Sequence, residues 1–253
     1  MSKKRNYGGL KAFFFLVIPG LMIIPFISSC GKGQGTYGAS ALNIRYQVVN
    51  LSPDVGPISL YIDFRQYNGL NFYYPAATGY FVLNSIDTPF QIRSSPVQLT
   101  NSTVTGQIYI PDINNILHPN FKYTLFVYGH AADRSISSML LTDTSSTLPP
   151  LGYGKVRFVN LSPSSGAFDI YANGTTSKRL QNLQYSHVSP YVVMPAGNYT
   201  FQVYPAGANT ANGGAVGSYP NLTVLDGRLY TLYTYGVVGH TDSLAFGIRG
   251  IAN

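Results

Sequence analysis

The sequence of 253 residues contains no tryptophan and no glutamate, and its nine acidic residues are all aspartates. Glutamate and lysine commonly fill exposed helical faces, so a chain with no glutamate and few lysines is a poor candidate for a helical fold. The chain is rich instead in aromatic residues, with 21 tyrosines and 14 phenylalanines, and in glycine and proline. Aromatic residues favour strands, while glycine and proline favour turns, so we expect an all-β protein.

Charged residues are also scarce, and the net charge of +7 is concentrated near the start of the chain. Four of the sixteen basic residues lie within the first eleven positions, whereas after position 30 twelve basic residues face nine acidic ones. This balance lacks the basic stripe that follows a phosphate backbone. Nucleic acid is therefore not an expected partner.

The single cysteine, Cys30, cannot form a disulfide within the chain. It follows a basic start and an apolar run, Ala12–Ile27, that proline and glycine interrupt. This run is shorter than the roughly 20 residues that a membrane-spanning helix needs. We therefore predict a leader peptide at residues 1–29.

The residues before the cysteine, Ile27–Cys30, read ISSC and resemble the lipobox of bacterial lipoproteins. The resemblance implies a lipoprotein signal peptide, with Cys30 carrying fatty acids such as palmitate and holding the protein on a membrane. An ordinary secretory leader and an uncleaved anchor stay open as alternatives. The glycine-rich residues 30–41 would form a flexible tether with a root-mean-square reach of roughly 15–20 Å.

Gly31, directly after the cysteine, resembles the sorting pattern of outer-membrane lipoproteins. The expected location is the outer membrane of the cell envelope, facing either the periplasm or the cell surface.

Three sequence blocks occur twice, in the same order and at a nearly constant offset, and the tetrapeptide NLSP belongs to the first of them. The matching ranges are 48–63 and 157–173, 79–95 and 190–206, and 121–129 and 228–236. This order indicates a duplicated domain. We predict domain 1 at 42–147, a linker at 148–153 and domain 2 at 154–253, with two prolines in the linker restricting the mutual orientation of the copies.

Each copy is expected to hold about seven short strands separated by turn signals. In YTLYTYG, residues 230–236, side chains alternate with the period of two that is typical of a strand. Short strands at this spacing favour two tandem immunoglobulin-like β-sandwich domains, with a β-barrel as the lesser alternative. Tyr123 and Tyr230 are placed to close a sandwich corner by bonding upstream backbone. NLSP is interpreted as turn chemistry at a strand end.

Three segments of the second copy are similar to a known bacterial family: VRFVNLSPSSGAFDIYANG, MPAGNYTFQVYPAG and DGRLYTLYTYG. Over residues 42–253 the chain resembles the domain of unknown function 4397 (DUF 4397), which occurs in secreted and lipid-anchored proteins, often in tandem. The resemblance implies a β-sandwich and export, and it supplies no catalytic residue. Asn50 and Asn160 stand where the family often has histidine.

No pattern of catalytic residues is found, since the chain has no G-x-S-x-G motif and no recurring pair of aspartates. We expect no enzyme activity and no cofactor. The four histidines, whose spacings differ between the copies, are expected in exposed loops, with no metal site. The aromatic stretch Gln66–Pro75 is the tentative ligand surface, specifically Tyr67 and Tyr73, which have no counterpart in the second copy.

The sequence thus favours a non-catalytic, lipid-anchored protein of the cell envelope that presents two β-sandwich modules for adhesion, scaffolding or ligand binding. A glycan or another envelope protein is the expected partner. A self-assembling, fimbria-type subunit whose strand edges accept a partner strand is the alternative. A hydrolase with a dispersed site is the third hypothesis.

Overall fold

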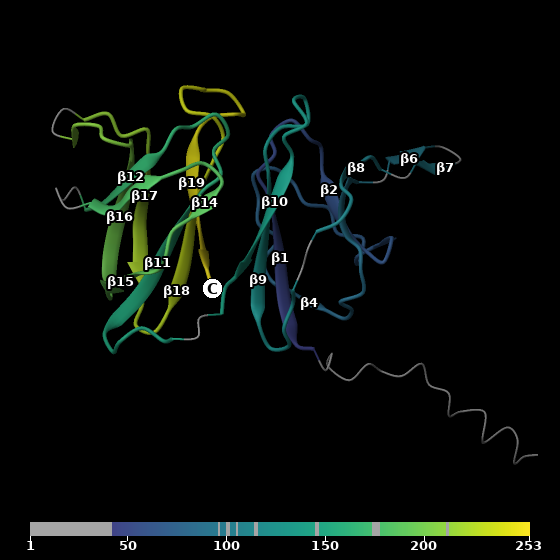
Figure 1. The fold of residues 1–253 in the computed structure, drawn as a ribbon, viewed down its shortest axis with the longest axis horizontal. Helices are drawn as coiled ribbons and strands as arrows, with labels where there is room; N and C mark the ends of the chain where they lie inside the picture. The colour runs from purple at the N-terminus through teal and green to yellow at the C-terminus, as the bar shows by residue number, and fades with distance from the viewer. Residues whose placement is uncertain are drawn as a thin grey trace, which may run out of the picture. The chain divides into compact units, whose positions relative to one another are not determined.

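The computed structural model describes residues 42–95, 97–99, 102–104, 106–113, 116–144, 147–173, 178–210 and 213–253. Cys30, the leader at 1–29 and the tether at 30–41 lie outside the described residues, so lipidation stays a prediction. Within the described ranges every named element is a β-strand, which confirms the all-β prediction (Figure 1). None of these residues belongs to a helix that is long and apolar enough to cross a membrane.

The first copy contains ten strands: β1 (Ile44–Asn50), β2 (Ile58–Ile62), β3 (Arg65–Gln66), β4 (Phe81–Leu83), β5 (Phe90–Ser94), β6 (Val97–Leu99), β7 (Ser102–Val104), β8 (Ile108–Ile110), β9 (Lys122–Tyr128) and β10 (Ser137–Thr142). The second copy contains nine: β11 (Tyr153–Asn160), β12 (Phe168–Ala172), β13 (Lys178–Leu183), β14 (His187–Val188), β15 (Val192–Pro195), β16 (Gly197–Pro205), β17 (Gly217–Val224), β18 (Leu229–Tyr235) and β19 (Gly247–Ala252).

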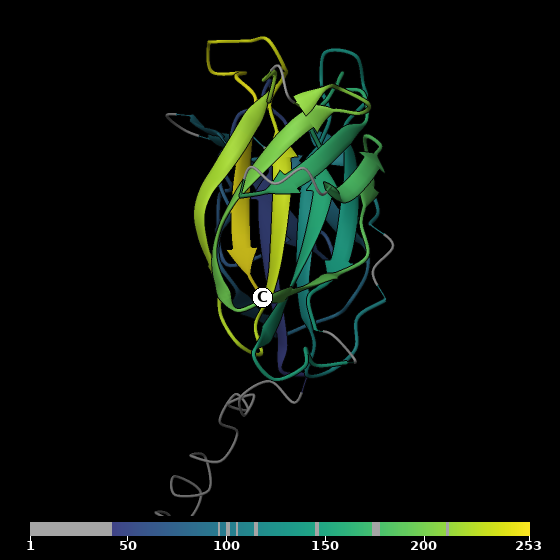
Figure 2. The ribbon, with the colours of Figure 1, turned by 90° about the vertical axis from the view of Figure 1, so that its left-hand side faces the viewer.

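Each copy forms two sheets. In the first copy these are β10-β9-β1-β4 and β3-β2-β5-β8, with β6 and β7 as a separate hairpin. In the second copy they are β14-β11-β18-β19, with β15 also paired to β11, and β13-β12-β16-β17. The central pairs β1·β9 and β11·β18 are parallel, whereas the other pairs are antiparallel. In Figure 2 the neighbouring strands β18 and β19 (yellow) run side by side.

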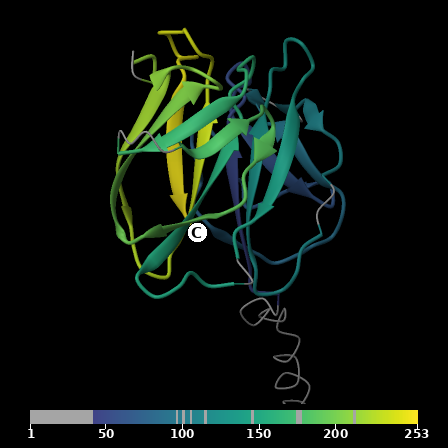
Figure 3. The same cartoon turned by 60° about the vertical axis from the view of Figure 1, so that its left-hand side comes forward.

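Two hydrophobic cores fill the two sandwiches. The first contains Tyr46, Phe72 and Phe90, and the second contains Phe158 and Phe201. A third apolar cluster joins the sheet of β1 and β9 to the sheet of β11 and β18. The four main sheets are therefore stacked as layers with a core between each pair, and the two copies lie side by side (Figure 3).

The central strands are buried on both faces because they have neighbours on both sides. In β1, Tyr46 and Val48 point into the first core and Val49 points into the third cluster. In β11, Phe158 points into the second core and Val159 into the third cluster. A strand that alternates between two apolar surroundings reads as a continuous apolar run, so its pattern does not reveal the contact between the copies.

The contact between the copies is pseudo-symmetric. The rings of Phe126 and Tyr233, which occupy equivalent positions in the two copies, meet edge to face with centroids 5.2 Å apart. Val49 and Val159, also equivalent, are both fully buried in the same cluster. Each copy thus presents the same patch to the other, as in an isologous homodimer.

The two corner tyrosines confirm the sequence prediction. The Tyr123 hydroxyl accepts a hydrogen bond from the His118 N–H at 2.8 Å, and the Tyr230 hydroxyl accepts one from the Leu225 N–H at 3.1 Å. Both tyrosines are buried. Each hydrogen bond joins the loop that precedes the strand to a tyrosine within that strand.

The NLSP repeat does more than form a turn, which corrects the interpretation from sequence. Asn160 and Ser162 are fully buried, and the Asn160 Oδ1 accepts hydrogen bonds from the Ser162 N–H and the Thr234 hydroxyl. The Ser162 hydroxyl donates to the Gly236 carbonyl at 2.6 Å, just beyond the neighbouring strand β18. The motif therefore joins the ends of two parallel strands, and it recurs because both copies have this pair.

A buried polar network crosses between the copies near the starts of the central strands. The Arg157 guanidinium forms an ion pair with Asp143 and donates to Thr231 Oγ1 at 2.9 Å. In the first copy the equivalent of Arg157 is Gln47, which donates to Thr124 Oγ1 at 2.7 Å. Burial raises the pKa of Asp143, although the guanidinium, the Thr124 hydroxyl and the Tyr80 hydroxyl oppose this shift. The charge pair is thus one point at which the copies have diverged.

We predict that Ser162→Ala lowers the free energy of unfolding by about 1–3 kcal/mol, because the buried Gly236 carbonyl loses its donor. Ser52→Ala should have a similar effect, since Ser52 donates to Gly129 in the first copy at 2.7 Å. Urea denaturation measures both. Ser218→Ala, at an exposed position of β17, is the matched control. An equal loss of unfolding free energy in this variant would show that the buried hydrogen bonds of Ser52 and Ser162 do not stabilise the protein.

Arg157→Gln should lower the free energy of unfolding by about 3–5 kcal/mol, because it leaves the buried Asp143 carboxylate without its cation. The double variant Arg157→Gln with Asp143→Asn replaces the charge pair by amides, the residue types that Gln47 and Asn253 supply at the equivalent positions. We expect it to recover to within about 1 kcal/mol of the natural protein. A double-mutant cycle in urea tests this; additive losses would contradict a coupled pair.

Candidate functional site

Two pairs of tyrosines cross the contact between the copies, one on each side of the pseudo-twofold axis. Tyr128 of the first copy meets Tyr185 of the second, with ring centroids 6.0 Å apart and planes at 87°. The equivalent residues, Tyr235 and Tyr74, meet at 6.2 Å and 80°. The duplication therefore builds the same aromatic contact twice.

The two tyrosine pairs differ in their surroundings. At the second pair, the Tyr74 hydroxyl is buried and has no hydrogen-bond partner among the described residues. The Arg249 guanidinium lies 5.5 Å from the centroid of the Tyr235 ring. At the first pair, the Tyr128 hydroxyl is hydrogen-bonded to the Ser186 hydroxyl and both tyrosines line an open groove. The two pairs thus differ: one contains a buried hydroxyl that has no partner among the described residues, and the other lines a groove.

We call this open site the junction groove. It has a volume of about 360 Å³ and lies where β9 and β11 end. Hydroxyl groups dominate its walls, accompanied by one carboxylate and one imidazole, and both copies contribute. The lining residues are Tyr128, His130, Asp133, Ser135, Ser137, Pro163, Ser164, Tyr185 and Ser186.

Short hydrogen-bonded loops hold the polar wall of the groove. Asp133 Oδ1 accepts the Ser135 N–H at 2.9 Å, and the Ser135 hydroxyl and N–H lower the pKa of the exposed Asp133 carboxyl. The His130 Nδ1 lies 3.9 Å from Asp54 Oδ1. Burial favours a higher pKa for Asp54, but the N–H groups of residues 131 and 132 outweigh it and lower the pKa. Both carboxylates therefore stay ionised at neutral pH.

Tyr185 forms the aromatic wall. Burial raises its pKa to about 12, and the neighbouring Tyr128 and Asp133 act in the same direction. Its hydroxyl is therefore protonated at physiological pH and can donate a hydrogen bond. A wall of protonated hydroxyls beside one ionised carboxylate offers both donors and acceptors to a ligand rich in hydroxyl groups.

The tentative ligand residues Tyr67 and Tyr73 do not form one exposed surface. Tyr67 is only 9% exposed; its ring belongs to the first core and its hydroxyl is hydrogen-bonded to Val82 and Asn84. This corrects the expectation of a surface aromatic residue at Tyr67, because the core between the sheets absorbs its ring. Tyr73 is 58% exposed, and ligand binding there stays a prediction.

Tyr67 contributes to a second, smaller groove of about 250 Å³, whose wall is mostly polar. It includes Asp63, Arg65 and Asp87 and lies within the first copy alone. The mixture of charges at this groove favours no single ligand class.

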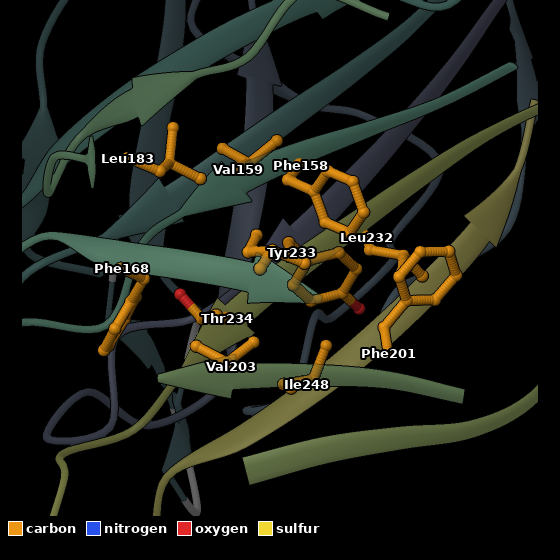
Figure 4. A pocket seen from close by; sticks show the side chains of 11 residues that line it. Phe158, Val159, Phe168, Leu183, Phe201, Val203, Leu232, Tyr233, Thr234 and Ile248 are labelled. Carbon is orange, nitrogen blue, oxygen red and sulfur yellow. The ribbon is translucent and has the colours of Figure 1, made fainter. Parts of the chain in front are cut away.

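The interior of the second sandwich offers no room for a ligand. The apolar space among Phe158, Phe168, Phe201 and Leu232 has a volume of about 10 Å³, at the lower limit for one water molecule. Figure 4 shows these side chains converging between the sheets. This space is therefore part of the packed core.

The histidines lie at the surface or partly buried, apart from one another. His118, His187 and His240 are exposed, and His130 is partly buried at the junction groove. Among the residues that the structure describes, no three histidine, cysteine or aspartate side chains come together to hold a metal ion.

Sequence reasoning missed the junction groove. The repeated blocks and the histidines in loops were recognisable, but nothing in the sequence indicated that the two copies meet there. The available signal was the difference between copies: the loops after the equivalent strands β9 and β18 differ in length and spacing.

The fold and the groove define a tandem β-sandwich protein whose two copies share one contact. The chain matches the model of the domain of unknown function DUF4397 over residues 45–171 and 154–247, and it belongs to this family. The expectation of two tandem copies is confirmed. No curated protein matches the sequence.

Among solved structures, the chain is similar to one described as "Alpha-glucan binding by a streptococcal virulence factor". The identity is 9%, the match covers 75% of this chain and 91% of that chain, and the TM-score is 0.23. A likeness at this level carries no conclusion about function.

We predict opposite effects of removing a hydroxyl at the two tyrosine pairs. Tyr74→Phe should leave the free energy of unfolding unchanged or raise it by up to about 1 kcal/mol, because the buried hydroxyl has no partner. Tyr128→Phe should lower it by about 1 kcal/mol, because the bond to Ser186 is lost. Urea denaturation of residues 42–253 compares the two variants. A larger loss of stability for Tyr74→Phe than for Tyr128→Phe would contradict the difference in hydrogen bonding between the two pairs.

Proposed function

We propose that the protein is a non-catalytic, lipid-anchored component of the cell envelope that binds a hydroxyl-rich ligand, such as a glycan, at the junction groove. The observation that carries this proposal is the groove of about 360 Å³ that Tyr128 and Tyr185 line beside Asp133.

The chemistry of the groove suits a sugar. Serine and tyrosine hydroxyls both donate and accept hydrogen bonds, as sugar hydroxyls do. An ionised aspartate accepts stronger hydrogen bonds than a neutral group, and tyrosine rings supply apolar area beside a polar tip. The volume of about 360 Å³ falls in the range of small-molecule sites.

The placement of the groove fits display from a membrane. Leu42, the first described residue, precedes the start of β1, and the groove lies at the opposite ends of the central strands, next to Tyr128 and Pro163 (Figure 1). A chain anchored through Cys30 would therefore carry the groove on the side away from its tether. The proposed location is the outer membrane.

Binding to a glycan array tests the ligand proposal, using residues 42–253, which form one compact unit. The natural sequence should bind one class of glycan. Tyr185→Ala and Asp133→Asn should each weaken binding about tenfold, the effect of losing one good hydrogen bond or ring contact.

The matched controls are Tyr74→Ala and Asp242→Asn. Tyr74 is the equivalent of Tyr185 in the first copy, and Asp242 is an exposed aspartate in the loop after the equivalent strand β18. Both controls should bind as the natural sequence does. Absence of glycan binding, or equal losses in all four variants, would contradict the proposal.

Two further outcomes would favour the other hypotheses. Release of sugar from bound glycans would contradict the non-catalytic part and favour a hydrolase. Concentration-dependent polymers of residues 42–253 would favour the fimbria-type subunit. The anchor is tested separately, by labelling the full chain with a palmitate analogue in cells: Cys30→Ala should abolish incorporation.

A further inference from the structure

Three leucines that precede β11 and β18 are unusually exposed. Leu151 is 90% exposed, Leu148 77% and Leu225 52%. Tyr153, which begins β11, is 39% exposed in the same region. Single exposed apolar residues are normal, but a group of them in one place marks an interaction site.

Leu151 and Leu225 belong to two turns that are hydrogen-bonded to each other, and Leu148 lies three residues before Leu151 in the chain. The Gly152 N–H donates to Asp226 Oδ1 at 2.8 Å, and the Gly227 N–H donates to the Tyr153 carbonyl at 2.9 Å. Leu151 and Leu225 therefore lie on neighbouring turns that hold each other in place. We call Leu148, Leu151 and Leu225 the leucine tip.

The leucine tip lies at the same end of the molecule as the point where the tether enters. Leu42 accepts a hydrogen bond from the Asn120 N–H at 2.8 Å, close to the start of β9. The Asp143 N–H donates a hydrogen bond to the carbonyl of Lys122, the first residue of β9. The Asp143 carboxylate forms an ion pair with Arg157 of β11. The starts of β1, β9, β11 and β18 accordingly lie at one end of the molecule (Figure 1).

Basic side chains lie at the same end of the molecule as the leucine tip. Arg228 follows the turn of Leu225 and is exposed, and Arg45 is exposed near the start of β1. Lys122, at the start of β9, is partly exposed and lies over the Tyr80 ring. The exposed acid among these turns is Asp226, whose Oδ1 accepts the Gly152 N–H. Apolar side chains beside a surplus of basic ones match an anionic lipid surface.

We propose that the leucine tip inserts into the headgroup region of the membrane that holds the fatty acids on Cys30. This inference rests on the proposed lipid anchor. Eleven residues, 31–41, separate Cys30 from Leu42, so even a fully extended chain would leave this end of the protein at most about 43 Å from the acylated residue. Insertion of the tip fixes the orientation of the protein and holds the junction groove away from the membrane.

Fluorescence of a single introduced tryptophan tests the proposal, because the chain has none of its own. Residues 42–253 carrying Leu151→Trp are attached by an N-terminal hexahistidine tag to nickel-chelating lipids in vesicles that contain phosphatidylglycerol. The tag replaces the tether, so the measurement does not depend on Cys30. We expect the emission to shift to shorter wavelength and lipids with brominated acyl chains to quench it.

The matched control is Val238→Trp, at a 38% exposed position in the loop after β18, at the far end of the molecule. Its emission should be unaffected by the vesicles. Unchanged emission of Leu151→Trp on vesicles to which the protein is attached would overturn the proposal, and so would an equal response of both variants.

Partitioning without the tag gives a second readout. Replacing Leu148 and Leu151 by serine should weaken sedimentation of residues 42–253 with the same vesicles about tenfold, the effect of losing one buried leucine or more. Serine at Val188 and Val238, which are exposed near the far end, should not. Palmitate labelling that persists in Cys30→Ala would overturn the anchor alone, whereas equal sedimentation of all variants would overturn the leucine tip.

Discussion

The packing of one central parallel strand pair against its duplicate determines the rest of this structure. The pairs β1·β9 and β11·β18 face each other, and Phe126 meets Tyr233 where the two copies are equivalent. Because these strands are buried on both sides, each copy needs the other to cover its inner sheet. The two sandwiches are therefore parts of one compact unit.

Divergence between the copies gives this symmetric arrangement two different sides. On one side the Tyr74 hydroxyl is buried without a partner among the described residues, and on the other side Tyr128 and Tyr185 line the junction groove. The buried polar network also differs between the copies. The second copy has Arg157 where the first has Gln47. The first copy has Asp143 where the second has Asn253. A charge pair arises only when a first copy meets a second copy. Pairing of two first copies would bury Asp143 without a cation, so the network favours pairing within one chain.

The parts of the fold that depend on local sequence were predictable, and those that depend on distant contacts were not. The all-β class, the duplication and the corner tyrosines Tyr123 and Tyr230 follow from alternation, turn residues and repeated spacing. The parallel pairing joins segments more than 70 residues apart, and the contact between the copies joins residues of different sheets, such as Phe126 and Tyr233. A single sequence does not encode either of them locally. Tyr67 was misread because a buried and an exposed tyrosine look alike in a sequence. The groove went unnoticed for the same reason, since Tyr185 became informative only once its contact with Tyr128 was seen.

The distance between one spin label in each copy tests the shared contact most directly. Residues 42–253 contain no cysteine, so labels can be attached to cysteines introduced at Ile108 and Ser218, which are exposed on the outer sheets of the two copies. If the central strand pairs hold the copies together, pulsed electron paramagnetic resonance will give a single narrow distance distribution. A broad distribution, of the kind that a flexible linker produces, would contradict the account.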